Sequence, residues 1–101
     1  MKLAVVGDKD TVLLFAFAGV EGRVVDNANE AIEEIRQLKR TKQYALIIIT
    51  EQVSIWAEEL ILSLKFSKEL PLILDIPSSM GHLEEVKSLA KYIKETIGIK
   101  I

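Results

Sequence analysis

An uninterrupted apolar run, Tyr44-Ala45-Leu46-Ile47-Ile48-Ile49-Thr50, constrains the fold of this chain more than any other stretch. Its apolar side chains do not alternate with polar ones, so a strand formed here must be covered on both faces. Strands of this kind lie in the centre of parallel sheets that carry helices on both sides. The run therefore predicts an α/β domain with residues 44–50 in the middle of its sheet.

The rest of the chain alternates strand and helix signals. Further strands are expected at residues 2–6, 23–25 and 72–76, and helices after the N-caps Asp8 and Asn27 and over residues 52–67 and 82–96. Right-handed crossovers build a four-stranded parallel sheet from a βαβαβαβα pattern, and the flavodoxin/receiver-like order 2-1-3-4 is expected. We expect residues 1–77 to form a Rossmann-like α/β domain. Residues 78–101 are expected to form a C-terminal amphipathic helix and tail that belongs to this domain or extends onto a partner.

Composition narrows the function. The net charge of −2 and the pI near 5.4 exclude an electrostatic grip on nucleic acid or anionic lipid. The absence of cysteine excludes disulfides and thiolate metal sites. The longest uncharged apolar stretch, residues 11–20, is about half of what a bilayer span requires, and no signal-peptide layout opens the chain. We expect a cytoplasmic protein that does not insert into a membrane and reaches one only through a partner.

Two acids, Asp8 and Asp10, follow the first strand, where a phosphoacceptor receiver domain has its acidic pocket. Such a domain also needs an aspartate after the third strand, where this chain has Thr50-Glu51, and a lysine after a fifth strand, which is missing. The two acids are therefore interpreted as capping the following helix and favouring its dipole.

No other arrangement of residues indicates chemistry. The glycines do not form a phosphate-binding motif, and His82 is the single histidine, without ligand spacing around it. Trp56 either lies over Lys or Glu stems or marks a contact surface. We expect no catalytic residue, no cofactor and no metal.

The first helix carries no charge over residues 11–20. If Val12 and Phe15 face the sheet, other apolar side chains point elsewhere and need cover of their own. The expected sheet order leaves this helix alone on its side of the sheet. A possible secondary contact surface on it consists of Leu13, Leu14 and Phe17.

The last helix offers that cover. Its apolar residues recur at spacings of three and four, as in a coiled-coil seam, and Leu89 widens the stripe. One interpretation is an amphipathic helix folded back over the first helix; the other is a helix that docks on a partner's helices. The residues of this expected partner-helix interface, called the α-helical seam below, are Leu83, Val86, Leu89, Ala90, Ile93 and Ile97.

A family resemblance rests on several short segments taken together. These are Gly7-Asp8-Lys9-Asp10-Thr11-Val12, residues 15–19, Ile48-Ile49-Thr50-Glu51, Asp75-Ile76-Pro77-Ser78 and Ile97-Gly98-Ile99-Lys100-Ile101. In this order and spacing the chain resembles the F subunit of V-type and archaeal-type (A-type) ATPases from end to end. It departs from the family at Leu14, at Phe17 and in a less charged third helix, which affects the surfaces around the first and third helices.

The resemblance implies a small, non-catalytic central-stalk (rotor) component of a rotary ATPase. It implies a C-terminal helix that packs along the coiled-coil shaft, which is the D subunit, with the A/B head as a further contact, at the cytoplasmic periphery of a membrane. It also implies that the protein couples ATP hydrolysis or synthesis to ion transport without an active site of its own. The alternative is a degenerate receiver-like module that binds a protein partner without phosphorylation.

Overall fold

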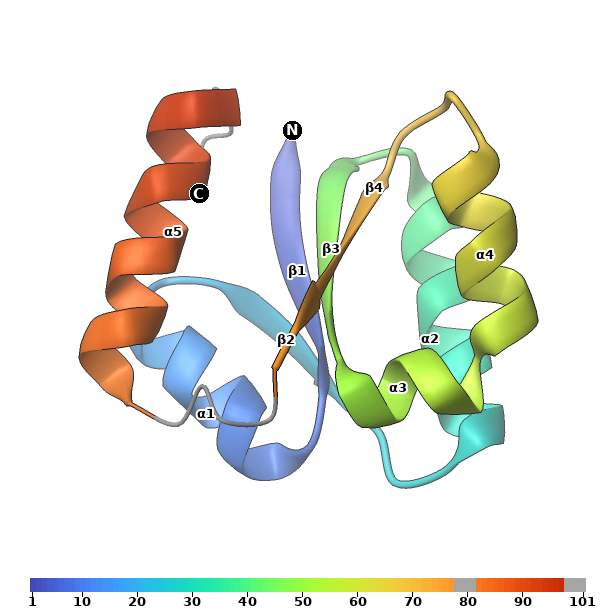
Figure 1. Ribbon diagram of the computed structural model, residues 1–101, viewed down its shortest axis with the longest axis horizontal. Helices are drawn as coiled ribbons and strands as arrows, with labels where there is room; N and C mark the ends of the chain where they lie inside the picture. Colours follow the sequence, from blue (N-terminus) through green and yellow to red (C-terminus); the bar gives the residue numbers. More distant parts are fainter. Residues whose placement is uncertain (78–81, 98–101) are drawn as a thin grey trace.

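The computed structural model describes residues 1–77 and 82–97 (Figure 1). Strands and helices alternate along most of the chain, as the sequence predicts. In chain order they are β1 (Lys2–Gly7), α1 (Lys9–Phe17), β2 (Glu21–Val24), α2 (Ala28–Thr41), β3 (Tyr44–Thr50), α3 (Glu51–Trp56), α4 (Glu58–Phe66), β4 (Leu72–Ile76) and α5 (Leu83–Ile97).

The strands form one parallel sheet in the order β2-β1-β3-β4, which confirms the predicted topology. In the register of the sheet, Val5 of β1 lies opposite Ile48 of β3, and Ile48 lies opposite Leu74 of β4. Every residue of β3 is buried. Its unbroken apolar character therefore reflects cover on both faces, because helices pack on each side of the sheet.

The helices divide between the two faces of the sheet (Figure 1). On one face, α2, α3 and α4 cover a core cluster that includes Ile35, Ile47 and Ile61. On the other face, α1 and α5 lie side by side over a second cluster that includes Phe15 and Ile48. The C-terminal helix thus supplies the apolar cover that the first helix requires over its uncharged residues, which begin at Thr11.

The prediction of a single helix over residues 52–67 is wrong. The chain turns at Ala57, whose backbone angles (φ −117°, ψ 32°) leave the helical region, and α3 and α4 run in different directions (Figure 1). The Ala57 N–H still donates to the Val53 carbonyl, and the Ala57 carbonyl accepts from the Ile61 N–H. Both backbone groups of Ala57 therefore keep a hydrogen-bond partner at the turn. The change of direction lets Val53 and Ile61 both enter the same core cluster.

Candidate functional site

The carboxyl end of β1 is built as a helix cap. The Asp8 carboxylate accepts a hydrogen bond from the Thr11 backbone N–H (3.2 Å) and another from the Thr11 hydroxyl (2.7 Å). Partial burial opposes ionisation of this carboxyl, but hydrogen bonds from Thr11, together with those from the backbone of Asp8 and Asp10, outweigh burial and lower its pKa below 3.8. A carboxylate held in this way stabilises the start of α1. This geometry confirms the capping interpretation of Asp8.

The neighbouring end of β3 is closed by packing. A β-carbon placed on Gly7 would lie 2.7 Å from the Thr50 methyl carbon, so the two strand ends approach closely. The Thr50 hydroxyl accepts from the Val53 backbone N–H at 3.3 Å and caps α3. The position that a receiver domain gives to its phosphoacceptor aspartate is therefore occupied by a capping threonine whose methyl group fills the space beside Gly7.

The two residues singled out in the sequence as isolated candidates lie apart from any ligand cluster. His82 is exposed at the residue before α5, and Trp56 is half-buried against the core on the α2 side of the sheet. Within residues 1–77 and 82–97, no group of three or more histidine, aspartate or glutamate side chains is placed to hold a metal ion.

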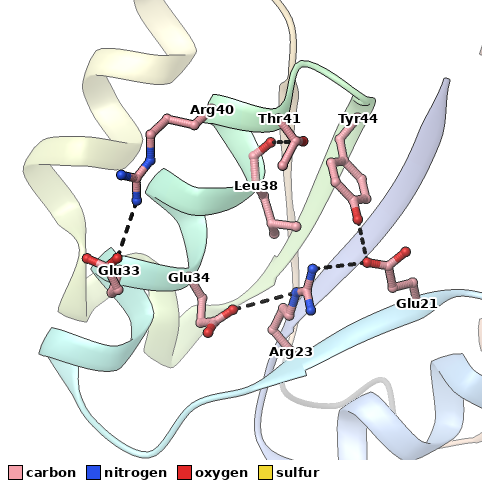
Figure 2. Close-up of polar contacts among 8 residues, drawn as sticks. All are labelled: Glu21, Arg23, Glu33, Glu34, Leu38, Arg40, Thr41 and Tyr44. Atoms are coloured by element: carbon pink, nitrogen blue, oxygen red, sulfur yellow. Dashed lines mark hydrogen bonds and ion pairs between the residues drawn. The ribbon is translucent and has the colours of Figure 1, made fainter.

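A network of polar side chains ties β2 to α2 and β3 (Figure 2). Arg23 lies between two carboxylates, with its Nη2 atom 3.2 Å from Glu21 and its Nε atom 3.6 Å from Glu34. The second contact is longer than a hydrogen bond and acts through charge alone. The Tyr44 hydroxyl donates to the Glu21 carboxylate. The network therefore connects an edge strand, a helix and the central strand.

We interpret this network as structural and not as catalytic. Burial, and next the hydrogen bond and negative charge of Glu21, raise the pKa of the Tyr44 hydroxyl above 10.0. A tyrosine with a raised pKa is a poor base at neutral pH. On the outer side of α2, Arg40 Nη2 lies 3.3 Å from Glu33 Oε1 (Figure 2). Both side chains are exposed to solvent, so this ion pair contributes little to stability.

The α-helical seam of α5 faces the domain's own sheet. Val86, Ala90 and Ile93 are buried in the core cluster on the α1 side, and Leu89 packs against its margin. Leu83 is half-buried at the start of the helix. Ile97 ends α5, and its side chain lies outside the described part of the chain. In this structure the seam is therefore covered within the molecule, and its role as a partner interface stays a prediction.

The predicted secondary surface on α1 is smaller than expected. Leu13 and Phe17 are exposed and point away from the sheet. Leu14, grouped with them in the sequence, instead packs against the core cluster that α1 shares with α5. The reason is that α5 adds a second apolar neighbour to α1, so the buried side of α1 is wider than the sheet alone would make it.

A further apolar surface lies on α3 and α4, where the sequence predicts a second apolar strip but indicates no role for it. Ile55, Leu62 and Phe66 are exposed on α3 and α4. Their spacing of seven and four residues marks a second stripe along residues 52–67, and that stripe was the available signal. What it could not reveal is the turn at Ala57, which changes how these side chains are arranged.

No helix within the described residues is both long enough and apolar enough to span a bilayer.

The family model described as the ATP synthase (F/14-kDa) subunit matches residues 3–93. The chain is similar to the A-type ATP synthase F subunit of Methanothermobacter thermautotrophicus, with 42% identity covering 98% of this chain and 94% of the relative. It is also similar to the A-type F subunit of Methanocaldococcus jannaschii, with 34% identity covering 100% and 99%. The V-type ATP synthase F subunit of Fusobacterium nucleatum is 35% identical, covering 99% and 94%.

Proposed function

This chain belongs to the family of the ATP synthase (F/14-kDa) subunit, whose members include F subunits of V-type and A-type ATP synthases, and we propose that it is a central-stalk (rotor) subunit without an active site of its own. In this proposal it braces the coiled-coil shaft, the D subunit, and helps to couple ATP hydrolysis or synthesis to ion transport. The A/B head is a further contact, and the protein lies at the cytoplasmic periphery of the membrane. The observation that carries the proposal is the similarity to these relatives over nearly the whole chain.

The packing of α5 supports a proposal in which this helix binds either its own sheet or the shaft. Burial of a valine or isoleucine side chain is worth about 1.5–3 kcal/mol, so uncovering Val86 and Ile93 together costs roughly 3–6 kcal/mol. The free chain therefore keeps α5 on its sheet. Release of the helix requires a partner that covers the same side chains, and a coiled-coil shaft provides such a surface.

The dimensions of α5 suit this exchange. The helix has 15 residues, which corresponds to about 22 Å, or roughly two heptads of a coiled coil. Its seam is narrow, and the opposite side carries charged residues such as Glu84, Lys87 and Lys91. A helix of this kind adds to a two-helix shaft without burying charge. Residues 1–77 then form the globular part that stays folded while α5 changes partner.

Co-expression with a tagged shaft protein from the same genome tests the proposal. We expect the chain to co-purify with the shaft in a stoichiometric complex that survives size-exclusion chromatography. Failure to form any complex would remove the central-stalk assignment. A parallel NMR titration with acetyl phosphate and Mg²⁺ addresses the receiver-like alternative, because phosphorylation or metal binding would shift the amide signals of Asp8 and Asp10, and we expect no such shift.

A further inference from the structure

Three exposed apolar side chains lie on α3 and along α4, on either side of the turn at Ala57. Ile55 is 69% exposed, Leu62 47% and Phe66 85%. Leu62 and Phe66 are four residues apart on α4 and therefore lie on one side of that helix. Clusters of exposed apolar side chains on a folded domain mark places where another molecule binds.

The turn at Ala57 makes this region concave. Ile55 on α3 and Ile61 and Leu62 on α4 form the apolar part of an open hollow of about 400 Å³. The hollow is completed by polar side chains from three elements, namely Glu51, Ser54, Glu58, Lys65 and Asp75. A straight helix over residues 52–67 would present a convex surface here, so the hollow is a direct result of the turn.

An ion pair fixes one wall of the hollow. Lys65 Nζ on α4 lies 2.5 Å from the Asp75 carboxylate on β4. This contact holds α4 against the last strand of the sheet and keeps both side chains in place. The wall is therefore built from the globular part and does not involve α5.

The charge around the hollow indicates what binds there. Glu51, Glu58 and Asp75 bring three carboxylates, against the single ammonium group of Lys65. The formal charge of the side chains that line the hollow is therefore negative on balance. An apolar floor with an acidic rim is complementary to an amphipathic helix whose apolar stripe is flanked by lysine or arginine.

We propose that this surface, the α3–α4 corner (Ile55, Glu58, Leu62, Lys65 and Phe66), binds one helix of the shaft through an apolar stripe with basic flanks. The inference rests on the proposed function and names the surface through which the globular part braces the shaft. It also explains how the shaft can bind before α5 is released, since the seam of α5 is buried and cannot make the first contact. The corner is available while α5 remains on the sheet.

Binding of the full-length chain to the purified shaft protein, measured by biolayer interferometry, tests the proposal. We expect Ile55→Asp and Leu62→Asp each to raise the Kd about tenfold or more, because exposed apolar side chains at the centre of an interface carry much of its affinity. Ser63→Asp is the matched control: it adds the same charge to the adjacent, exposed position on α4 without removing an apolar contact. Its Kd should stay within about twofold of the unsubstituted chain.

Charge reversal provides a second readout. Glu58→Lys should lower the association rate constant, and the decrease should shrink as salt is added. Glu33→Lys, a charge reversal at another exposed glutamate, on α2, is the control and should leave the rate unchanged. Circular dichroism verifies that each variant is folded, which is expected because the substituted side chains are exposed.

Three results would overturn the inference. The first is shaft binding that Ile55→Asp and Leu62→Asp leave intact, which would refute the corner but not the central-stalk role. The second is a Leu13→Asp effect larger than that of either corner variant, which would place the contact on α1. The third is a free chain with twice the 11.3 kDa monomer mass by light scattering that Leu62→Asp returns to monomer, since the occupant would then be a second copy. A chain that never binds the shaft refutes the proposed function itself.

Discussion

Leu74→Ala should tighten shaft binding although it weakens the fold. Leu74 lies on β4, half-buried on the face that α5 covers, and it lines the same groove as Leu89 and Ile93. Truncation of a fully buried leucine costs about 2–5 kcal/mol, so a half-buried one should cost about 1–2 kcal/mol. If that loss falls on the docking of α5, the docking equilibrium shifts by a factor of about 5–30.

The sign of the effect on affinity follows from the exchange of partners. The shaft binds the seam only when α5 is undocked, and an apparent Kd rises as the competent fraction falls. Leu74→Ala weakens the docked state and leaves the seam intact, so the apparent Kd should fall by up to the same factor. Ile93→Ala removes a side chain that both states bury, so it should weaken both docking and shaft binding.

Isothermal titration calorimetry with the shaft protein measures the apparent Kd. Urea unfolding of the free chain measures the free energy of unfolding. Leu60→Ala is the matched control, because Leu60 is another half-buried leucine but packs on the opposite face of the sheet. It should lower the free energy of unfolding by a similar amount and leave the Kd unchanged. A Leu74→Ala variant that binds the shaft less tightly, or no differently from Leu60→Ala, would show that docking of α5 does not compete with shaft binding.

Three further predictions concern the sheet and its caps. Gly7→Ala should lower the free energy of unfolding by about 1–3 kcal/mol, because the new β-carbon meets the Thr50 methyl at 2.7 Å. Thr50→Ser removes that methyl and keeps the capping hydroxyl, so Gly7→Ala should be less destabilising in a Thr50→Ser chain. Equal losses with Thr50 and with Ser at this position, measured by urea unfolding, would contradict this. Asp8→Ala should cost about 1 kcal/mol at pH 7. Since its pKa is lowered, the contribution of the ionised carboxylate is present above pH 3.8 and is lost as the pH falls through the lowered value. A stability difference between the two chains that does not shrink as the pH falls below 3.8 would refute the cap. The raised pKa of Tyr44 means that the natural chain loses stability as the pH rises above 10.0, whereas Tyr44→Phe should lack that loss; parallel stability curves in this range would contradict it.

The sequence contains enough information for the topology because each strand and helix follows a simple rule. The unbroken apolar run of β3 can be satisfied only in the centre of a covered sheet, and short connections with right-handed crossovers then leave few strand orders. The part of α1 from Thr11 onward has no charge and requires an apolar neighbour, and α5 is the helix that provides it. These are properties of local pattern, and they carry through to the folded domain.

The turn at Ala57 could not be read in the same way. Val53, Ala57, Ile61 and Leu64 fall on one side of a continuous helix, so their spacing is equally consistent with a straight element. The direction of α4 depends on the core beneath it, and the hollow also needs Asp75 of β4, the strand that follows α4, to meet Lys65. The placement of Leu14 was missed for a related reason, since it depends on how closely α5 approaches α1. Contacts of this kind arise only once the elements have assembled.

The exchange of α5 between its own sheet and the shaft can be observed directly with a single thiol, because the chain has no cysteine of its own. Leu46 is buried on β3 in the groove that it shares with Leu89 and Ile93, so a maleimide should react with Leu46→Cys only when α5 leaves. Leu38→Cys, on the buried side of α2 and on the opposite face of the sheet, reports any general opening of the fold. We expect the shaft protein to accelerate labelling of Leu46→Cys and to leave labelling of Leu38→Cys unchanged. Labelling of Leu46→Cys that the bound shaft leaves unchanged or slows would contradict this expectation.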